Sequence, residues 1–154
     1  MISPKHPFWL VGFRPFFSLA CIAGLSLPIL WILVLKGVLP APSAVYSPTQ
    51  WHAHEMFFGF GWAVLGGFLL TSTKNWVNVR GYHGSVLIYL TLAWLVERGI
   101  MAFGGHLPSV LFWLGSQLFL LSIVGLLLAT LIRHRQSDSY RQDNQFFLII
   151  LPVF

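Results

Sequence analysis

The sequence is short of charge, and above all of acidic residues. Only 8% of its 154 residues are charged, whereas a soluble domain carries about a quarter. Nine Lys and Arg residues stand against four Asp and Glu, 56% of the residues are hydrophobic, and the mean hydropathy is +0.76. Because so few charges cannot cover a water-facing surface, the composition excludes a soluble globular domain and predicts an integral membrane protein.

Cysteine is nearly absent too. The single thiol, Cys21, excludes an internal disulfide and any CxxC site. The apolar run around Cys21 continues well past it, so we expect a retained span rather than a cleaved signal. The basic residues lie between apolar runs and form no cluster that could follow a phosphate backbone, which excludes a nucleic-acid partner and leaves the lipid bilayer.

Four apolar runs reach the roughly 20 residues that a helix needs to cross a bilayer. They do not alternate polar and apolar residues, so strands are not expected. The sequence predicts an all-α, polytopic transmembrane helical bundle forming a single membrane domain over residues 1–154. The predicted spans are 16–35, 56–73, 85–103 and 108–132.

The last residues, 146–154, resemble the start of a fifth span but are too short to cross a bilayer. We therefore expect the chain to be a fragment of a longer protein. Its further partners would be the missing C-terminal part of that protein or other membrane subunits.

Lys and Arg residues predict the orientation. With the N-terminus in the cytoplasm, seven of the nine lie on the inner side and only Lys36 and Arg98 on the outer side. In that topology His52, His54 and Glu55 lie at the outer side. The end of the third span brings Glu97 and Arg98 to the same depth, with His106 nearby, whereas His6, His83 and His134 fall in connectors on the opposite side.

The segment Trp51–Met56, WHAHEM, holds the polar residues most suited to chemistry. Imidazole binds haem iron, copper and zinc, Glu55 could orient a ring or act as a ligand, and Met56 would suit Cu(I). On a helix His52 and His54 point about 200° apart, so they would not bind one ion together. The alternative is that both imidazoles are merely interfacial.

Glu97 and Arg98 are neighbours in the third predicted span. Adjacent helical residues do not face each other, so no pairing between them is expected. One interpretation is that Arg98 simply reaches the interface. In the other, Arg98 pairs with Glu55 or with a haem propionate at the same depth, because a planar guanidinium suits carboxylates.

Several motifs together resemble the NnrS family in order and spacing. They are GFRPFF (Gly12–Phe17), WHAHEM followed by Gly59-Phe60, GFLLT (Gly67–Thr71) with Asn75-Trp76, and RQDNQFF (Arg141–Phe147). The family consists of longer bacterial inner-membrane proteins that contain haem and copper and are associated with nitric oxide metabolism and nitrosative stress. The chain would correspond to an N-terminal portion.

The resemblance implies a multi-pass protein of the bacterial inner membrane with haem and copper as cofactors. By this resemblance His52 and His54 are candidate ligands; with the chemistry of their neighbours, the metal-binding candidates are His52, His54, Glu55 and Met56, and His52, His54 and Arg98 are the candidates for holding a cofactor. A second hypothesis, from a different class, is a non-catalytic membrane scaffold or transporter fragment with structural histidines. Neither hypothesis decides whether the chain is an enzyme.

Overall fold

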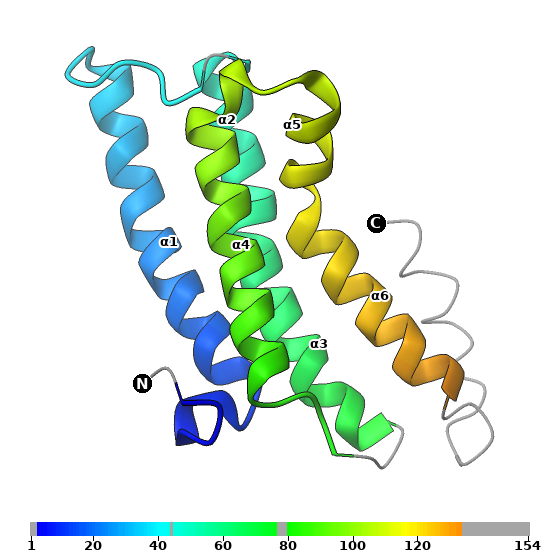
Figure 1. The fold of residues 1–154 in the computed structure, drawn as a ribbon. Helices are drawn as coiled ribbons and strands as arrows, with labels where there is room; N and C mark the ends of the chain where they lie inside the picture. Colours follow the sequence, from blue (N-terminus) through cyan, green and yellow to red (C-terminus); the bar gives the residue numbers. More distant parts are fainter. Residues whose placement is uncertain (1–2, 44, 77–79, 134–154) are drawn as a thin grey trace.

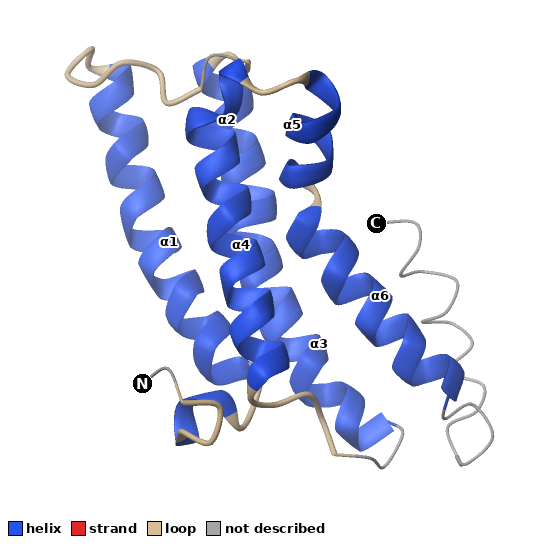
Figure 2. Cartoon of the chain, viewed as in Figure 1, coloured by secondary structure: helices blue, strands red, loops and turns tan. Residues whose placement is uncertain are grey.

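The computed structural model describes residues 3–43, 45–76 and 80–133, and every regular element in them is helical (Figures 1 and 2). The predicted all-α fold is confirmed. The partial span 146–154 and His134 lie outside the described residues. The main helices are α1 (Phe13–Leu35), α2 (Pro48–His54), α3 (Trp62–Trp76), α4 (Ser85–Phe103), α5 (Ser109–Ser116) and α6 (Leu118–Arg133), with short helical turns η1 (Pro7–Trp9) and η3 (Gly104–His106).

Three helical stretches are long and apolar enough to cross a membrane, and α5 with α6 makes a fourth if the bent pair counts as one span. The third predicted span, 85–103, coincides with α4. The first begins at Phe13, three residues earlier than predicted, so Arg14 and Pro15 lie in its first turn. All four predicted spans therefore correspond to helical stretches of the bundle.

The second span begins eight residues earlier than the predicted Met56. Ser47 and Gln50 form a reciprocal capping box and Pro48 fills the first helical turn, so the helix starts at Pro48. One stretch of 26 residues, Pro48–Thr73, is then long and apolar enough to cross a membrane. It includes a π-helical segment, η2 (Glu55–Gly61), between α2 and α3. The histidine motif therefore lies inside this helix rather than ahead of it.

The fourth span is not the single straight helix that was predicted over 108–132. It is bent by 49° between α5 and α6, as Figure 1 shows. At the break the backbone N–H of Phe119 donates to Glu97 Oε2 at 3.0 Å instead of to the preceding helical turn. A polar side chain from another helix thus replaces the hydrogen bond that the bend removes.

Small residues hold α1 against α3 at the end of the bundle near the N-terminus. A Cβ on Gly12 would lie 2.7 Å from Leu70 Cβ, and one on Gly67 would lie 2.8 Å from Phe16 Cβ. The backbone N–H of Phe13 also donates to Thr71 Oγ1 at 3.0 Å. The segments GFRPFF and GFLLT therefore pack on each other and set the spacing of the two helices.

Candidate functional site

Arg98 of α4 lies between two buried carboxylates at the end of the bundle where α1 and α4 finish. Its Nη1 donates to Glu55 Oε2 at 3.0 Å, and its Nη2 donates to Glu97 Oε1. The side chains of Glu55 and Glu97 are 4% and 1% exposed, and that of Arg98 is 13% exposed. Of the alternatives considered for Arg98, the structure shows the pairing with Glu55.

The expectation that Glu97 and Arg98 would not face each other is wrong. Although adjacent residues diverge on a helix, the long guanidinium reaches back to the Glu97 carboxylate. Both Arg98 nitrogens named above are therefore engaged by protein carboxylates. This leaves Nε, which is buried and has no hydrogen-bond partner, so Arg98 is not free to hold a haem propionate with its full fork.

These two carboxylates are the whole acidic content of the described residues, because the other acids, Asp138 and Asp143, lie further along the chain. With full charges, two carboxylates and one guanidinium leave one negative charge inside a membrane-crossing bundle. Placing an ionisable side chain inside the membrane costs free energy. Such residues are therefore candidates for a functional role.

The π-helical segment brings its backbone against this ion pair. A Cβ on Gly59 would lie 2.7 Å from Arg98 Nη1 and 3.1 Å from Glu55 Oε2. Trp94 Nε1 donates to the Gly59 carbonyl at 3.0 Å, and Arg98 Cζ lies 5.7 Å from the centre of the Trp94 ring. Gly59 and Trp94 thus contact the Arg98 guanidinium from two sides and restrict its position.

His54 lies beside the same carboxylate. Its Nδ1 is 3.6 Å from Glu55 Oε1 and has no hydrogen-bond partner. Its ring centre is 4.7 Å from that of Phe58 and 6.1 Å from that of Tyr46. A small shift would let Nδ1–H donate to Glu55 and leave Nε2 for a ligand, which is the usual arrangement of metal-binding histidines.

His52 faces a different helix. Its ring stacks on Trp31 of α1, with centres 4.5 Å apart and planes 8° from parallel. Its Nδ1 is also buried without a hydrogen-bond partner. Stacking covers the faces of an imidazole but not its edge, where the ligating nitrogens lie. Met56, one helical turn away, is half-buried and packs against the apolar core.

The candidate ligands do not form one compact centre. In the part of the chain that the structure describes, no group of three or more His, Cys, Asp or Glu side chains could hold a metal ion together. This agrees with the opposed faces expected for His52 and His54. His52 and His54 each have a buried Nδ1 without a partner. This fits two separate metal-containing groups, each of which would receive one imidazole from this helix and its other ligands from elsewhere.

The remaining described histidines are exposed. His106 lies in η3 at the same end as the ion pair, whereas His6 accepts from the Phe8 N–H at 3.2 Å and His83 Nδ1 lies 3.0 Å from the Gly81 carbonyl. The prediction that His6 and His83 are loop residues is confirmed.

Sequence reasoning missed the contributions of Trp94, Gly59 and the π-helical segment. Trp94 lies four positions before Arg98 and so shares its face of α4. That spacing could have identified it. No pattern in Glu55–Gly61 indicates the wider helical turn that the structure shows there.

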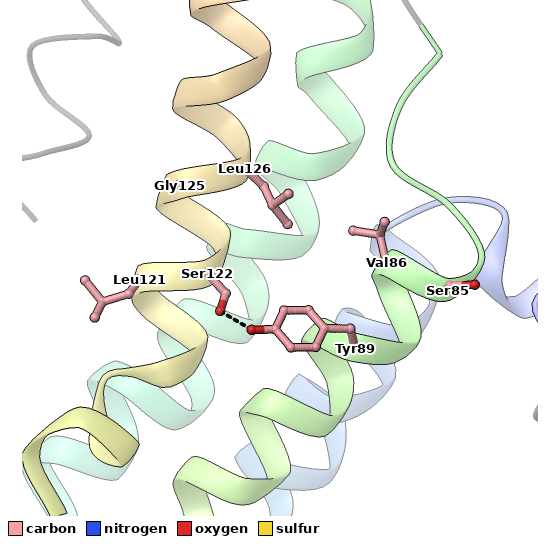
Figure 3. A pocket seen from close by; sticks show the side chains of 7 residues that line it. All are labelled: Ser85, Val86, Tyr89, Leu121, Ser122, Gly125 and Leu126. Carbon is pink, nitrogen blue, oxygen red and sulfur yellow. Dashed lines mark hydrogen bonds between the residues drawn. The ribbon is translucent and has the colours of Figure 1, made fainter. Parts of the chain in front are cut away.

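Hollows lie between the described helices, and two of them border the elements discussed above. One, of about 250 Å³, borders the ion pair and is lined by residues of α1, the Trp51–Glu55 turn and α4, including Arg98. The other, of about 510 Å³, lies between α4 and α6. Figure 3 shows Tyr89 and Ser122 within it, their hydroxyl groups 2.8 Å apart. These hydroxyls satisfy each other, so this second hollow holds no orphaned polar atom.

Comparison with families of known sequences tests the family resemblance that the motifs indicated. A family model described as NnrS protein matches residues 7–154. The chain belongs to the NnrS family. Comparison with curated proteins and with solved structures gave no match. Membership in the NnrS family, together with the span-forming helices, makes this a membrane protein and is consistent with a role related to nitric oxide.

Proposed function

We propose that this NnrS chain carries haem and copper and acts in nitric oxide metabolism or the response to nitrosative stress. The observation that carries the proposal is the pair His52 and His54, each with a buried Nδ1 lacking a hydrogen-bond partner. His54 also lies 3.6 Å from Glu55, a carboxylate that the Arg98 guanidinium holds at 3.0 Å. Buried polar atoms without partners are uncommon, and each calls for an explanation.

His52 and His54 would each supply one imidazole. Glu55 would orient the His54 ring rather than bind a metal, because Arg98 already holds its other oxygen. Met56 would be a soft ligand for Cu(I) if copper binds on the His52 side. When bound, haem iron or copper supplies a site for nitric oxide and for one-electron chemistry.

The proposed location is the bacterial inner membrane, with several spans and the N-terminus in the cytoplasm. Seven of the nine Lys and Arg residues support this orientation. It places the histidine pair near the periplasmic surface, where α1 and α4 end. A small neutral gas that diffuses through lipid could reach such a site directly.

The optical spectrum of the detergent-solubilised protein tests this proposal. We expect a Soret band, copper by elemental analysis, and a change in the reduced spectrum on adding nitric oxide. His52→Ala or His54→Ala should remove one of the two metals, whereas His106→Ala, at an exposed histidine of the same end, should retain both. A folded, colourless and metal-free protein would favour the membrane scaffold with structural histidines.

A further inference from the structure

The cavity of about 250 Å³ between α1 and α4 is almost wholly apolar, although Glu55 and Arg98 are among its lining residues. Glu55 Oε1 and Arg98 Nε are buried and do not face it. Arg98 Nη1 and Glu55 Oε2 are occupied with each other at 3.0 Å. Both charged residues therefore contribute mainly carbon to the wall. An apolar cavity of this kind stays dry and offers no hydrogen bond to a polar ligand.

The cavity reaches the surface of the bundle that faces lipid. Ile22 of α1 lines it and is 63% exposed, and Ser26 and Ala102, which also line it, are half-buried. Its inner wall includes Trp51 and Trp94, which are 4% and 6% exposed. The cavity thus leads from the lipid-facing side of α1 and α4 to the buried start of the second span.

Of the two histidines in the motif, His52 lies on the α1 side. Its ring stacks on Trp31 of α1, with centres 4.5 Å apart. Leu30 and Trp51, each the residue before one of these two rings, both line the cavity. The ring of His54 instead lies near aromatic residues of η2 and of the loop before α2. A molecule in the cavity is therefore beside the His52 side of the helix.

Small size and rigidity favour a gas over a lipid tail as the occupant. An acyl chain that enters the cavity exchanges one apolar surrounding for another, so it gains no hydrophobic free energy, yet it loses rotational freedom about its bonds. A gas of one or two atoms has no such bonds to restrict. An engineered apolar cavity of roughly 150 Å³ binds xenon, so about 250 Å³ is ample for a molecule of that size.

We propose that this cavity takes up a small neutral gas from the lipid and holds it beside His52. The identity of the gas as nitric oxide rests on the function proposed above, since nitric oxide is small, neutral and soluble in lipid. The cavity is then the route by which the gas reaches the His52 side of the motif.

Methyl NMR of the full chain in phospholipid nanodiscs under xenon pressure tests the uptake. Xenon is a neutral atom that needs neither haem nor copper for binding, so it reports on the cavity alone. We expect a saturable shift of the Ala23 methyl group, which lines the cavity and is 4% exposed. The Ala63 methyl group is 0% exposed and does not line this cavity, so its shift should stay small and linear in pressure.

Filling the cavity should remove the xenon shift and slow the entry of nitric oxide. Ala102→Leu fills it from α4, so the shift at Ala23 should disappear, and nitric oxide should rebind to the reduced, metal-loaded protein at least about fivefold more slowly after flash photolysis. Ser26→Leu fills the cavity from α1 and should have the same effects, which covers a failure of Ala102→Leu to fold. Ala129→Leu on α6 is the matched control, half-buried in the parent and outside the cavity lining, and should keep both parental values.

A parent that contains both metals but shows no saturable shift at Ala23 would overturn the uptake, and a lipid tail filling the cavity would give this result. Filling variants that lose the shift yet rebind nitric oxide at the parental rate would overturn the route. The double variant His52→Ala/His54→Ala should lose the metals and keep the xenon shift. A folded, metal-free parent with the shift would instead refute the proposed function and leave the gas site in place.

Discussion

Glu55 and Arg98 stand 43 positions apart in the sequence, yet their side chains meet at 3.0 Å inside the bundle. This contact joins the helix that carries WHAHEM to α4. It also fixes the carboxylate that lies beside His54. The ion pair therefore sets the position of the histidine motif within the membrane-crossing part of the chain.

Replacing Arg98 should destabilise the protein strongly. Arg98→Met leaves Glu55 and Glu97 buried without a cation, which costs about 3–5 kcal/mol in the free energy of unfolding. Denaturation in mixed micelles measures the change. Lys36→Met removes an exposed charge and should stay within about 0.5 kcal/mol of the parent. An Arg98→Met protein as stable as the parent would show that the ion pair is not a structural element.

Gly59 should not tolerate even a methyl group. In Gly59→Ala the new Cβ would lie 2.7 Å from Arg98 Nη1, so the guanidinium or the helix must shift, at a cost of about 1–3 kcal/mol. At Gly125 a Cβ meets nothing within 4 Å, so Gly125→Ala should instead stabilise α6, by up to about 1 kcal/mol. The same unfolding measurement compares the two. Equal effects at both positions would contradict the close approach at Gly59.

Glu97 should maintain the bend between α5 and α6. Glu97→Leu removes the acceptor for the Phe119 N–H, so the span should straighten and its ends move apart. Spin labels at Leu111→Cys and Ile132→Cys, in a Cys21→Ser background, report the distance across the bend. Glu97→Gln keeps an oxygen acceptor and should keep the parent distance. An unchanged distance in Glu97→Leu would show that the bend has another cause.

The proposed orientation predicts which exposed positions react from outside. Gln50 in α2 and His83 just before α4 are both exposed, and these two helices start at opposite ends of the bundle (Figure 1). In the Cys21→Ser background, Gln50→Cys should react with a membrane-impermeant maleimide added to intact spheroplasts. His83→Cys should react only after the membrane is opened. The reverse pattern would place the histidine motif on the cytoplasmic side.

Hydropathy and the order of the spans were enough to predict the bundle and the clustering at one end. Helix ends that share a depth bring Glu55 near Arg98 whatever the finer packing, so that pairing followed from topology. The sequence did not predict the link between Glu97 and Arg98, because helical geometry alone ignores how far a guanidinium reaches. The bend at α5 and α6 was missed because its cause, the Glu97 carboxylate, comes from another helix.

The start of the second span shows a different limit. Hydropathy placed it at Met56, after the polar residues, but local capping by Ser47 and Gln50 begins the helix at Pro48. A single sequence contains that capping signal, and weighing it would have put His52 and His54 inside the helix. The close approach of Gly59 to Arg98 joins two helices, so no local pattern indicates it.

Iron and copper content per protein in the double variant His52→Ala/His54→Ala tests the central claim most directly. The parent and a control with His6→Ala/His106→Ala, at two exposed histidines, should contain both metals. The double variant at the motif should fold and contain neither. Iron and copper at parental levels in that variant would contradict the claim that this pair of imidazoles holds the metal groups.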